Sequence, residues 1–210
     1  MWSARTPAYG QSMKNLLVAS NNQHKFEEIS AILSGLPLRM IKPGDLGIRL
    51  EVAETGSSYL ENSLIKAEAF HRASGLPVLA DDSGLEVELL NGAPGIHSRR
   101  FNPQPGANDR DRCLYLIKKL EGMPKPWLAR FNCVAVFYQN PTTWTHYHGT
   151  VDGEIIEEFR GEEGFGYDPV FFIPPYNKTM AELGTAIKNT ISHRANALKN
   201  LTALHQWANQ

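Results

Sequence analysis

The hydrophobic and polar positions of the chain follow strand and helix periods in turn. The apolar run at 15–20 (NLLVAS) is typical of a short buried strand. An apolar stripe over 26–33 then repeats at helix spacing, and Gly35 ends it. Strand, short polar loop and helix in this order predict the opening unit of an α/β protein.

A second helix and two further strands are predicted next. Ser58 and Glu61 form an S-x-x-E capping box, and the helix that they open stops at Ser74-Gly75. The apolar run at 77–81 predicts a buried strand, and the alternation at 84–90 (GLEVELL) predicts another with one wet face. The polar residues between these two strands are expected to form a turn.

The second half of the chain mixes helices, hairpins and a glycine-rich loop. The expected elements are a helix at 108–120, strands at 129–139 and 142–151, a hairpin turn at Asp152-Gly153 into a strand at 154–159, a structured loop at 161–178 around a short strand at 170–173, and a last helix from Ser192 to about Trp207. Helices interspersed with single strands and hairpins predict an α/β fold with a mixed sheet.

Composition indicates an ordinary globular protein. Hydrophobic residues make up 42% of the chain and charged residues 20%, which excludes wholesale disorder. The formal net charge of −1 argues against a dedicated duplex-DNA binder, whose affinity depends on neutralising phosphates. No apolar run approaches the roughly 20 residues that cross a bilayer. We therefore expect neither nucleic acid nor a membrane among the partners.

The cysteines and the N-terminus bear on where the protein works. Cys113 and Cys133 fall in a predicted helix and a predicted strand without C-x-x-C spacing, which fits a reducing cytoplasm better than a disulfide framework or a zinc site. Residues 1–13 lack the apolar core of a signal peptide, and we expect them to be a leader or an added extension. We expect a single domain over 14–210.

Two adjacent carboxylates, Asp81 and Asp82, follow a strand that is expected to be buried. Adjacent carboxylates repel each other and are costly to bury, so solvent, basic side chains or a metal ion must compensate them. A solvated strand end that caps a turn is one interpretation. The other is a metal site to which Glu54 adds a carboxylate, because Mg²⁺ prefers a few hard oxygen ligands near phosphates.

The polar loop SNNQHK joins the first predicted strand to the first predicted helix. A helix N-terminus presents unpaired backbone N–H groups and a partial positive charge, which suit phosphate. An Asn-rich turn that only caps the helix is the alternative interpretation. The candidate phosphate-binding residues are Ser20, Asn21, Asn22, Gln23, His24 and Lys25.

Two stretches toward the C-terminus combine groups that suit a purine. The loop GEEGFGYDPVFF places the rings of Phe165 and Tyr167 and the acceptor Asp168 among glycines. In NTISHR, His193 and Arg194 are expected in the first turn of the last helix, where cations are disfavoured unless they face an anion or an electron-rich ligand atom. A structural aromatic loop and a basic surface at a helix end stay open as alternatives.

The chain resembles the inosine/xanthosine triphosphate pyrophosphatase family, also called Ham1-like, in motifs that occur in order: ASNNQHKFEE, ETGSSYLENSLIKA, LADDSGLEVELLNGAPGIHS, GFGYDPVFF and KNTISHRANAL. The resemblance implies a two-lobed ITPase-like fold around a long mixed, twisted sheet flanked by helices, with the active site in the cleft between the lobes. It also implies a homodimer and hydrolysis of ITP, dITP and XTP to the monophosphate and pyrophosphate. The implied cofactor is Mg²⁺, with Mn²⁺ as a substitute.

The resemblance also implies roles for the matching positions. Glu54 and Asp82 would hold the metal, and Asp82 would be the general base. The substrate-binding residues would be the loop 20–25, Lys66 and Ser83 on the phosphate side, and Phe165, Gly166, Tyr167, Asp168, Lys188, His193 and Arg194 on the base side. Donors aimed at the 6-oxo group would favour inosine and xanthine over adenine, which carries a donor amine there.

Two other functions stay open. A Maf-type nucleotide pyrophosphatase would share the reaction but prefer other bases. A regulatory module that binds nucleotide without turnover would have no need of the carboxylates Glu54 and Asp82. The chain also departs from many relatives at Ala53, where they carry a second Glu, but no residue assigned above is missing.

Overall fold

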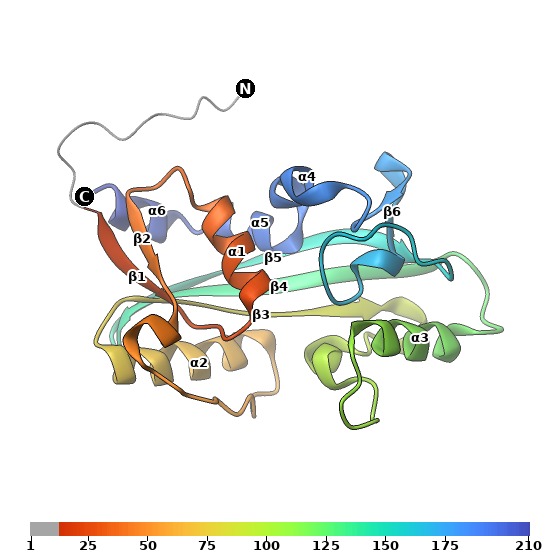
Figure 1. Cartoon of the computed structure of the whole chain (residues 1–210), viewed down its shortest axis with the longest axis horizontal. Coiled ribbons are helices and arrows are strands. Elements are labelled where there is room, and N and C mark those ends of the chain that lie inside the picture. Colours follow the sequence, from red (N-terminus) through yellow and green to blue (C-terminus); the bar gives the residue numbers. More distant parts are fainter. Residues whose placement is uncertain (1–12) are drawn as a thin grey trace. The chain divides into compact units, whose positions relative to one another are not determined.

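The structure, a computed structural model, describes residues 13–210. It contains a seven-stranded sheet in the order β2-β1-β3-β4-β5-β6-β7, and the predicted α/β class with a mixed sheet is confirmed (Figure 1). The elements are β1 (Lys14–Val18), α1 (Gln23–Ile32), β2 (Leu38–Ile41), α2 (Tyr59–Ser74), β3 (Val78–Val87), α3 (Asp109–Leu120), β4 (Trp127–Asn140), β5 (Thr143–Ile155), β6 (Phe171–Ile173), β7 (Lys178–Thr179), α4 (Gly184–Ile191), α5 (His193–Lys199) and α6 (Thr202–Ala208). β1 pairs in parallel with β2 and β3, whereas β6 pairs antiparallel with β5 and β7.

The described chain divides into two compact units. The first holds the chain up to Asp82 together with Val134–Gly149 and Arg194–Gln210. The second holds Ser83–Cys133 and Thr150–His193. The long strands β3, β4 and β5 each give residues to both units, and each unit has its own hydrophobic core.

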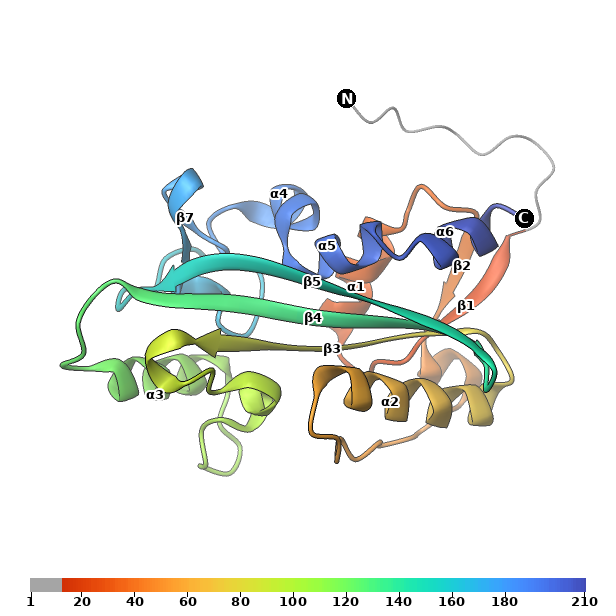
Figure 2. The same cartoon turned by 180° about the vertical axis from the view of Figure 1, so that it is seen from behind.

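In the first unit, helices cover both faces of the sheet. α2 lies on one face, and α1, α5 and α6 lie on the other (Figures 1 and 2). The core between α2 and the strands includes Leu17 of β1, Phe70 of α2, Val78 of β3 and Val136 of β4. Burial of such side chains supplies most of the driving force that orders the strands beside the polar residues.

The predicted start of α2 is confirmed. The hydroxyl of Ser58 accepts a hydrogen bond from the Glu61 N–H at 3.2 Å, which satisfies one of the open donors at the helix N-terminus. The Glu61 carboxylate also accepts from the N–H of Ser57 at 2.6 Å. Gly75, in the left-handed region at φ 71°, ends the helix.

In the second unit, α3 packs on the sheet. Its buried residues Cys113, Leu116 and Leu120 belong to one core with Leu85 of β3 and Phe131 of β4. Asn108 and Asp111 form a capping box at the start of α3, which agrees with the helix predicted at 108–120.

The predicted turn at Asp81–Gly84 is wrong. β3 runs from Val78 to Val87 without interruption, so both carboxylates lie inside a strand. Gly84 is required for space rather than for a turn, because a Cβ there would lie 2.2 Å from the carbonyl oxygen of Gly95. The strand accommodates the two acidic residues because basic and amide side chains compensate them, as described below.

The predicted turn at Asp152-Gly153 is also wrong. β5 continues through both residues to Ile155, so there is no separate strand over 154–159. A Cβ at Gly153 would lie 2.5 Å from the carbonyl oxygen of Phe172 in the neighbouring β6. The glycine therefore serves close packing of two strands rather than a reversal of the chain.

The predicted last helix is in fact two helices, α5 and α6, with a break at Asn200-Leu201. Ser192 ends the preceding α4, which the sequence pattern did not predict, and β2 and β7 were missed as well. Asn200 donates to the carbonyl oxygen of Asn196 at 2.8 Å, the kind of local bond by which asparagine competes with helix continuation. None of the helices between residues 13 and 210 has the length and the apolar character to cross a membrane.

Candidate active site

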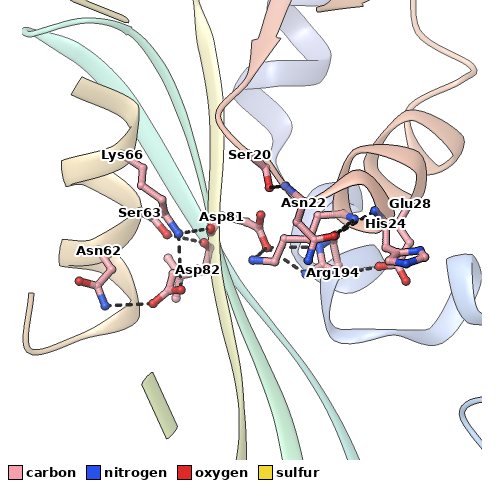
Figure 3. A network of polar contacts seen from close by, with 12 residues as sticks. Ser20, Asn22, His24, Glu28, Asn62, Ser63, Lys66, Asp81, Asp82 and Arg194 are labelled. Atoms are coloured by element: carbon pink, nitrogen blue, oxygen red, sulfur yellow. Dashed lines mark hydrogen bonds and ion pairs between the residues drawn. The ribbon is translucent and has the colours of Figure 1, made fainter. Parts of the chain in front are cut away.

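Asp81 and Asp82 are neighbours in β3 and point to opposite faces of the strand, because successive side chains of a strand alternate (Figure 3). Both are buried, with 3% and 5% of their surface exposed. Asp81 faces α1 and α5, whereas Asp82 faces α2. The two adjacent carboxylates therefore meet two different sets of partners.

Asp81 is the acceptor in a buried network of charges. Its Oδ2 accepts from the ammonium of Lys25 at 3.0 Å and from Nε and Nη2 of Arg194 at 3.2 and 3.0 Å. The guanidinium of Arg194 also binds the carboxylate of Glu28 in α1. Burial alone would raise the pKa of Asp81, but Lys25, Arg194 and then Lys66 outweigh it and hold the pKa well below its usual range. Asp81 is thus an anion at neutral pH, and it fixes two cations.

Asp82 lies in a different electrostatic environment. It accepts a hydrogen bond from Nδ2 of Asn62 at 3.1 Å, and its Oδ1 lies 3.5 Å from the ammonium of Lys66. Burial raises the pKa of Asp82, and the attraction of Lys66 and Lys25 only partly offsets this rise. A carboxylate with a raised pKa accepts a proton more readily than an ordinary aspartate does.

The ammonium of Lys66 lies between the two predicted metal ligands, Glu54 and Asp82. Lys66 Nζ is 2.7 Å from Glu54 Oε1 and donates to the carbonyl oxygen of Asp81 at 2.7 Å. Burial lowers the pKa of Lys66, but the carboxylates of Asp82, Asp81 and Glu54 outweigh it, so the net shift is upward. α2 therefore holds a fixed cation within contact of both carboxylates.

Glu54 and Asp82 share one ammonium, that of Lys66, whereas the single Asp81 carboxylate is bound by two cations, Lys25 and Arg194, so Glu54 and Asp82 suit a divalent cation better than Asp81 does. Across residues 13–210 there is no group of three or more His, Cys, Asp or Glu side chains placed to hold a metal ion. Two carboxylates that need water and ligand oxygens to complete the shell fit Mg²⁺, which keeps several waters and binds through one or two carboxylates plus phosphate.

The loop before α1 is built as a helix cap. Oδ1 of Asn22 accepts from the N–H groups of His24 and Lys25 at 2.9 and 3.3 Å, and Oγ of Ser20 accepts from the N–H of Asn22 at 3.1 Å. The side chains of Asn21 and Gln23 are exposed and bond to protein groups outside the loop. The capping interpretation is therefore correct for Asn22, while the role of the loop in binding phosphate stays a prediction.

The glycine-rich loop of the second unit is held through its backbone. Oδ2 of Asp168 accepts from the N–H of Phe165 at 2.9 Å and from the ammonium of Lys188 at 2.5 Å. That ammonium also lies 4.6 Å from the centre of the Phe165 ring. Gly164 has a φ of +83°, and a Cβ there would lie 2.2 Å from Asp168 Oδ2, so only glycine fits.

The loop's two aromatic residues are placed differently. Tyr167 is 4% exposed, its hydroxyl donates to the carbonyl oxygen of Ser98 at 2.9 Å, and burial raises its pKa. Phe165 is half-buried. Tyr167 thus anchors the loop from within the core, and Phe165 carries the more accessible ring.

His193 and Arg194 are neighbours in the chain but belong to different units. The ring of His193 stacks on that of Phe131, with 4.8 Å between centroids and 15° between planes. Arg194 is 1% exposed and bound to the carboxylates of Asp81 and Glu28. Contacts of either residue with a purine stay a prediction, as does the contact of the half-buried Ser83 with substrate.

Sequence reasoning missed several residues of these clusters. Glu28 and Asn62 lie three and four positions from Lys25 and Lys66 on the same helices, a spacing that places side chains on one face and could have found them. Ser98 contacts Tyr167 across 69 positions of sequence, and no local pattern indicates such a pair.

Comparisons with known proteins identify the family of this chain. The model of the Ham1 family matches residues 16–204. The dITP/XTP pyrophosphatase of Xanthomonas oryzae pv. oryzae is 45% identical over 192 residues, which cover 90% of this chain and 96% of the relative. That of Vibrio parahaemolyticus is 43% identical over 194 residues, with 91% and 96% covered. A solved HAM1 protein from Coxiella burnetii is 38% identical with a TM-score of 0.83, covering 93% of this chain and 100% of that one. The chain belongs to the Ham1 family.

Proposed function

We propose that the protein is a nucleoside-triphosphate pyrophosphatase that hydrolyses ITP, dITP and XTP to the monophosphate and pyrophosphate. The observation that carries the proposal is the buried carboxylate of Asp82, which accepts from Asn62 at 3.1 Å and lies 3.5 Å from an ammonium, that of Lys66, which also binds Glu54. The names of the relatives, dITP/XTP pyrophosphatases, support the substrate class. In the cell, this hydrolysis would remove non-canonical purine triphosphates from the nucleotide pool.

The ammonium groups of Lys25 and Lys66 bind the triphosphate in this proposal. Both are partly or largely buried and already fixed by carboxylates, so little side-chain freedom is lost when substrate arrives. They neutralise the charge that builds on the leaving pyrophosphate, which is the main electrostatic demand of the reaction. Ser20 and Asn22, at the N-terminus of α1, add side-chain hydrogen bonds, and Asn21, Gln23 and His24 border them.

Asp82 acts as general base. A water attacks the α-phosphorus, the bond from the α-phosphorus to the bridging oxygen breaks, and pyrophosphate leaves with the bonding electron pair. The proton of the attacking water passes to the Asp82 carboxylate, and burial raises the pKa of this group and so favours the transfer. Asn62 donates to Oδ2 of Asp82, whereas Lys66 faces Oδ1, so the amide orients the carboxylate.

We further propose that Glu54 and Asp82 hold Mg²⁺, with Mn²⁺ as a substitute. The bound ion would supply neutralisation of the phosphate oxygens. The donor set supports this, since it consists of two carboxylates beside one lysine, Lys66.

Stacking of the base is assigned to the glycine-rich loop of the second unit, whereas one of the candidate donors to the base, Arg194, belongs to the first. Phe165 offers a half-buried ring for stacking, in the loop completed by Gly166, Tyr167 and Asp168. Lys188, His193 and Arg194 are the candidate donors for the 6-oxo group, which adenine lacks. A donor facing the adenine amine is left unpaired, and such mismatches discriminate by ~10⁴ or more.

Two further parts of the proposal concern assembly and location. We propose a homodimer that works in the cytoplasm and binds neither nucleic acid nor membrane. The near-neutral net charge supports the absence of nucleic acid and the two buried free cysteines support a reducing compartment, whereas the homodimer rests on the resemblance to the family. Light scattering of the purified protein tests the dimer.

A pyrophosphate-release panel over ITP, XTP, dITP, GTP, ATP, dTTP and UTP, each with and without Mg²⁺, tests the function. We expect release from the first three substrates in Mg²⁺ at rates well above those from the other four. Preferential hydrolysis of dTTP or UTP would indicate a Maf-type enzyme instead. Binding of ITP without release of pyrophosphate would indicate a regulatory nucleotide-binding module.

A further inference from the structure

Helix α3 holds Gly166 of the glycine loop by both of its peptide groups. The N–H of Gly166 donates to Oδ2 of Asp109 at 2.8 Å, and its carbonyl oxygen accepts from the thiol of Cys113 at 3.3 Å. Asp109 and Cys113 are four positions apart, so their side chains lie one above the other on the same face of the helix. One helix face therefore grips one glycine at two points.

The loop needs such external contacts to have a defined shape. Gly164 and Gly166 both have φ in the left-handed region, at +83° and +65°. Glycine adopts positive φ about as readily as negative φ, so its own backbone preference does not fix the conformation of the loop. Phe165 lies between these two flexible positions. The direction of its ring is consequently set by what holds the backbone on either side: Asp168 at the N–H of Phe165 and α3 at Gly166.

Both gripping groups are themselves fixed. The Oδ1 of Asp109 pairs with Arg112, whose guanidinium also donates to the carbonyl oxygen of Ala107 at 2.6 Å, so Oδ2 is left to face Gly166. A carboxylate in the first turn of a helix is favoured by the helix dipole. Burial raises the pKa of Cys113 to about 12, which keeps the thiol protonated and able to donate.

We propose that Asp109 and Cys113 are positioning residues for purine binding: they fix Gly166 and thereby orient the Phe165 ring on which the base stacks. This inference rests on the proposed function, since it assigns a task to α3 only if Phe165 binds the base. Neither residue lies in a motif that points to nucleotide chemistry, and neither is required to touch the substrate.

The first test compares Asp109→Ala with Asp109→Asn and with Asp111→Ala as a matched control. Asp111 is a half-buried carboxylate in the same helical turn that caps α3 without contacting the loop. We expect Asp109→Ala to raise the KM for ITP about tenfold with kcat changed less than about twofold, because a hydrogen bond to a charged acceptor is lost. Asp109→Asn keeps an acceptor oxygen, so its KM should lie close to the parental value. Asp111→Ala should leave KM unchanged.

Cys113 supplies a second test in case Asp109→Ala fails to fold. Cys113→Ala removes the donor and should raise KM about threefold, while Cys113→Ser keeps a donor and should stay close to the parent. Equal KM values for the alanine and serine variants would overturn the role of Cys113. A parental KM in Asp109→Ala, or a loss of kcat shared equally by Asp109→Ala and Asp111→Ala, would overturn the positioning role of α3.

Amide exchange at Gly166 separates this inference from the proposed function. If the parent protein releases no pyrophosphate from any purine triphosphate, the proposed function fails, whatever α3 does. The contact itself is supported if protection of the Gly166 N–H falls in Asp109→Ala and persists in Asp111→Ala. Equal protection in the parent and both variants shows that Asp109 does not hold the loop and overturns the inference directly.

Discussion

The acidic cluster of the first unit and the glycine loop of the second are built on different principles. The first gathers charged side chains from α1, α2, β3 and α5, and each makes an ion pair with another. The second is one short segment held mainly by hydrogen bonds to its peptide groups. Paired charges suit phosphate chemistry, where electrostatics dominates, whereas a clamped backbone suits recognition of a flat ring, where shape dominates.

Within the acidic cluster, adjacency in sequence does not mean similarity in role. Asp81 has two cations on its carboxylate and a pKa pushed down, while Asp82 has an amide donor, a more distant lysine and a pKa pushed up. Strand alternation alone separates the two environments.

The largest effect is expected for Asp82→Asn. The substitution keeps the shape and the contact with Asn62 but removes the group that accepts the proton. Turnover of ITP should fall by about 10²- to 10⁴-fold, the usual contribution of a general base, while nucleotide binding measured by calorimetry and the far-ultraviolet circular dichroism persist. Turnover within a factor of two of the parent would remove Asp82 from the mechanism.

Asp81→Asn should act on stability first. It leaves Arg194 and Lys25 without their shared anion in a buried site, and breaking such a pair typically costs about 3 kcal/mol of unfolding free energy. Urea unfolding at pH 7 measures the loss.

The pH dependence of that loss provides its control. The folded pKa of Asp81 lies below its unfolded value, so the stabilisation is complete above the unfolded pKa of about 3.9 and disappears as pH falls toward the folded pKa. The stability difference between parent and variant should therefore shrink below about pH 4. A difference that stays constant into the acid range would contradict the assignment.

Phe165→Ala comes next, in the second unit. Loss of one stacking surface costs about 1–3 kcal/mol per base, so the KM for ITP should rise about tenfold or more while the unfolding midpoint changes little. Phe165→Leu keeps the apolar bulk, so its KM for ITP should lie between those of the parent and Phe165→Ala. An unchanged KM with a collapsed unfolding midpoint would favour a purely structural role for the loop.

The smallest effect is expected for Arg130→Ala. Arg130 and Asp152 form a 2.5 Å ion pair, but the two side chains are 53% and 72% exposed. Exposed pairs contribute at most about 1 kcal/mol, so the unfolding free energy should change by less than that and turnover should not change. A loss as large as that of Asp81→Asn would show that burial is not what separates the two pairs.

Sequence patterns predicted local structure well where one period dominates. The helix at 108–120 appears with its cap at Asn108, and the inward positions of the C-terminal segment, from Ala195 to Leu204, are buried as expected. The failures share a cause. Gly84 and Gly153 look like turn residues in sequence, but each makes room for a neighbouring backbone that lies far away along the chain.

The candidate residues were predictable as a group, but their partners were not. The pattern indicated that basic side chains, solvent or a metal must compensate Asp81 and Asp82, and the structure shows basic side chains beside both. It did not indicate that Arg194, 113 positions away, binds Asp81 rather than lying open at a helix start. Such pairings depend on tertiary packing, and the periodicity of hydrophobic residues along the sequence carries no information about it.

The balance of charged side chains around β3 affects how an anion binds. Three cationic side chains, those of Lys25, Lys66 and Arg194, face four carboxylates, those of Glu28, Glu54, Asp81 and Asp82. This cluster thus has fewer positive than negative side chains before a substrate binds, and a polyphosphate without a counter-cation would be repelled. Binding of the polyphosphate should therefore be coupled to binding of a cation, so that each increases the affinity for the other.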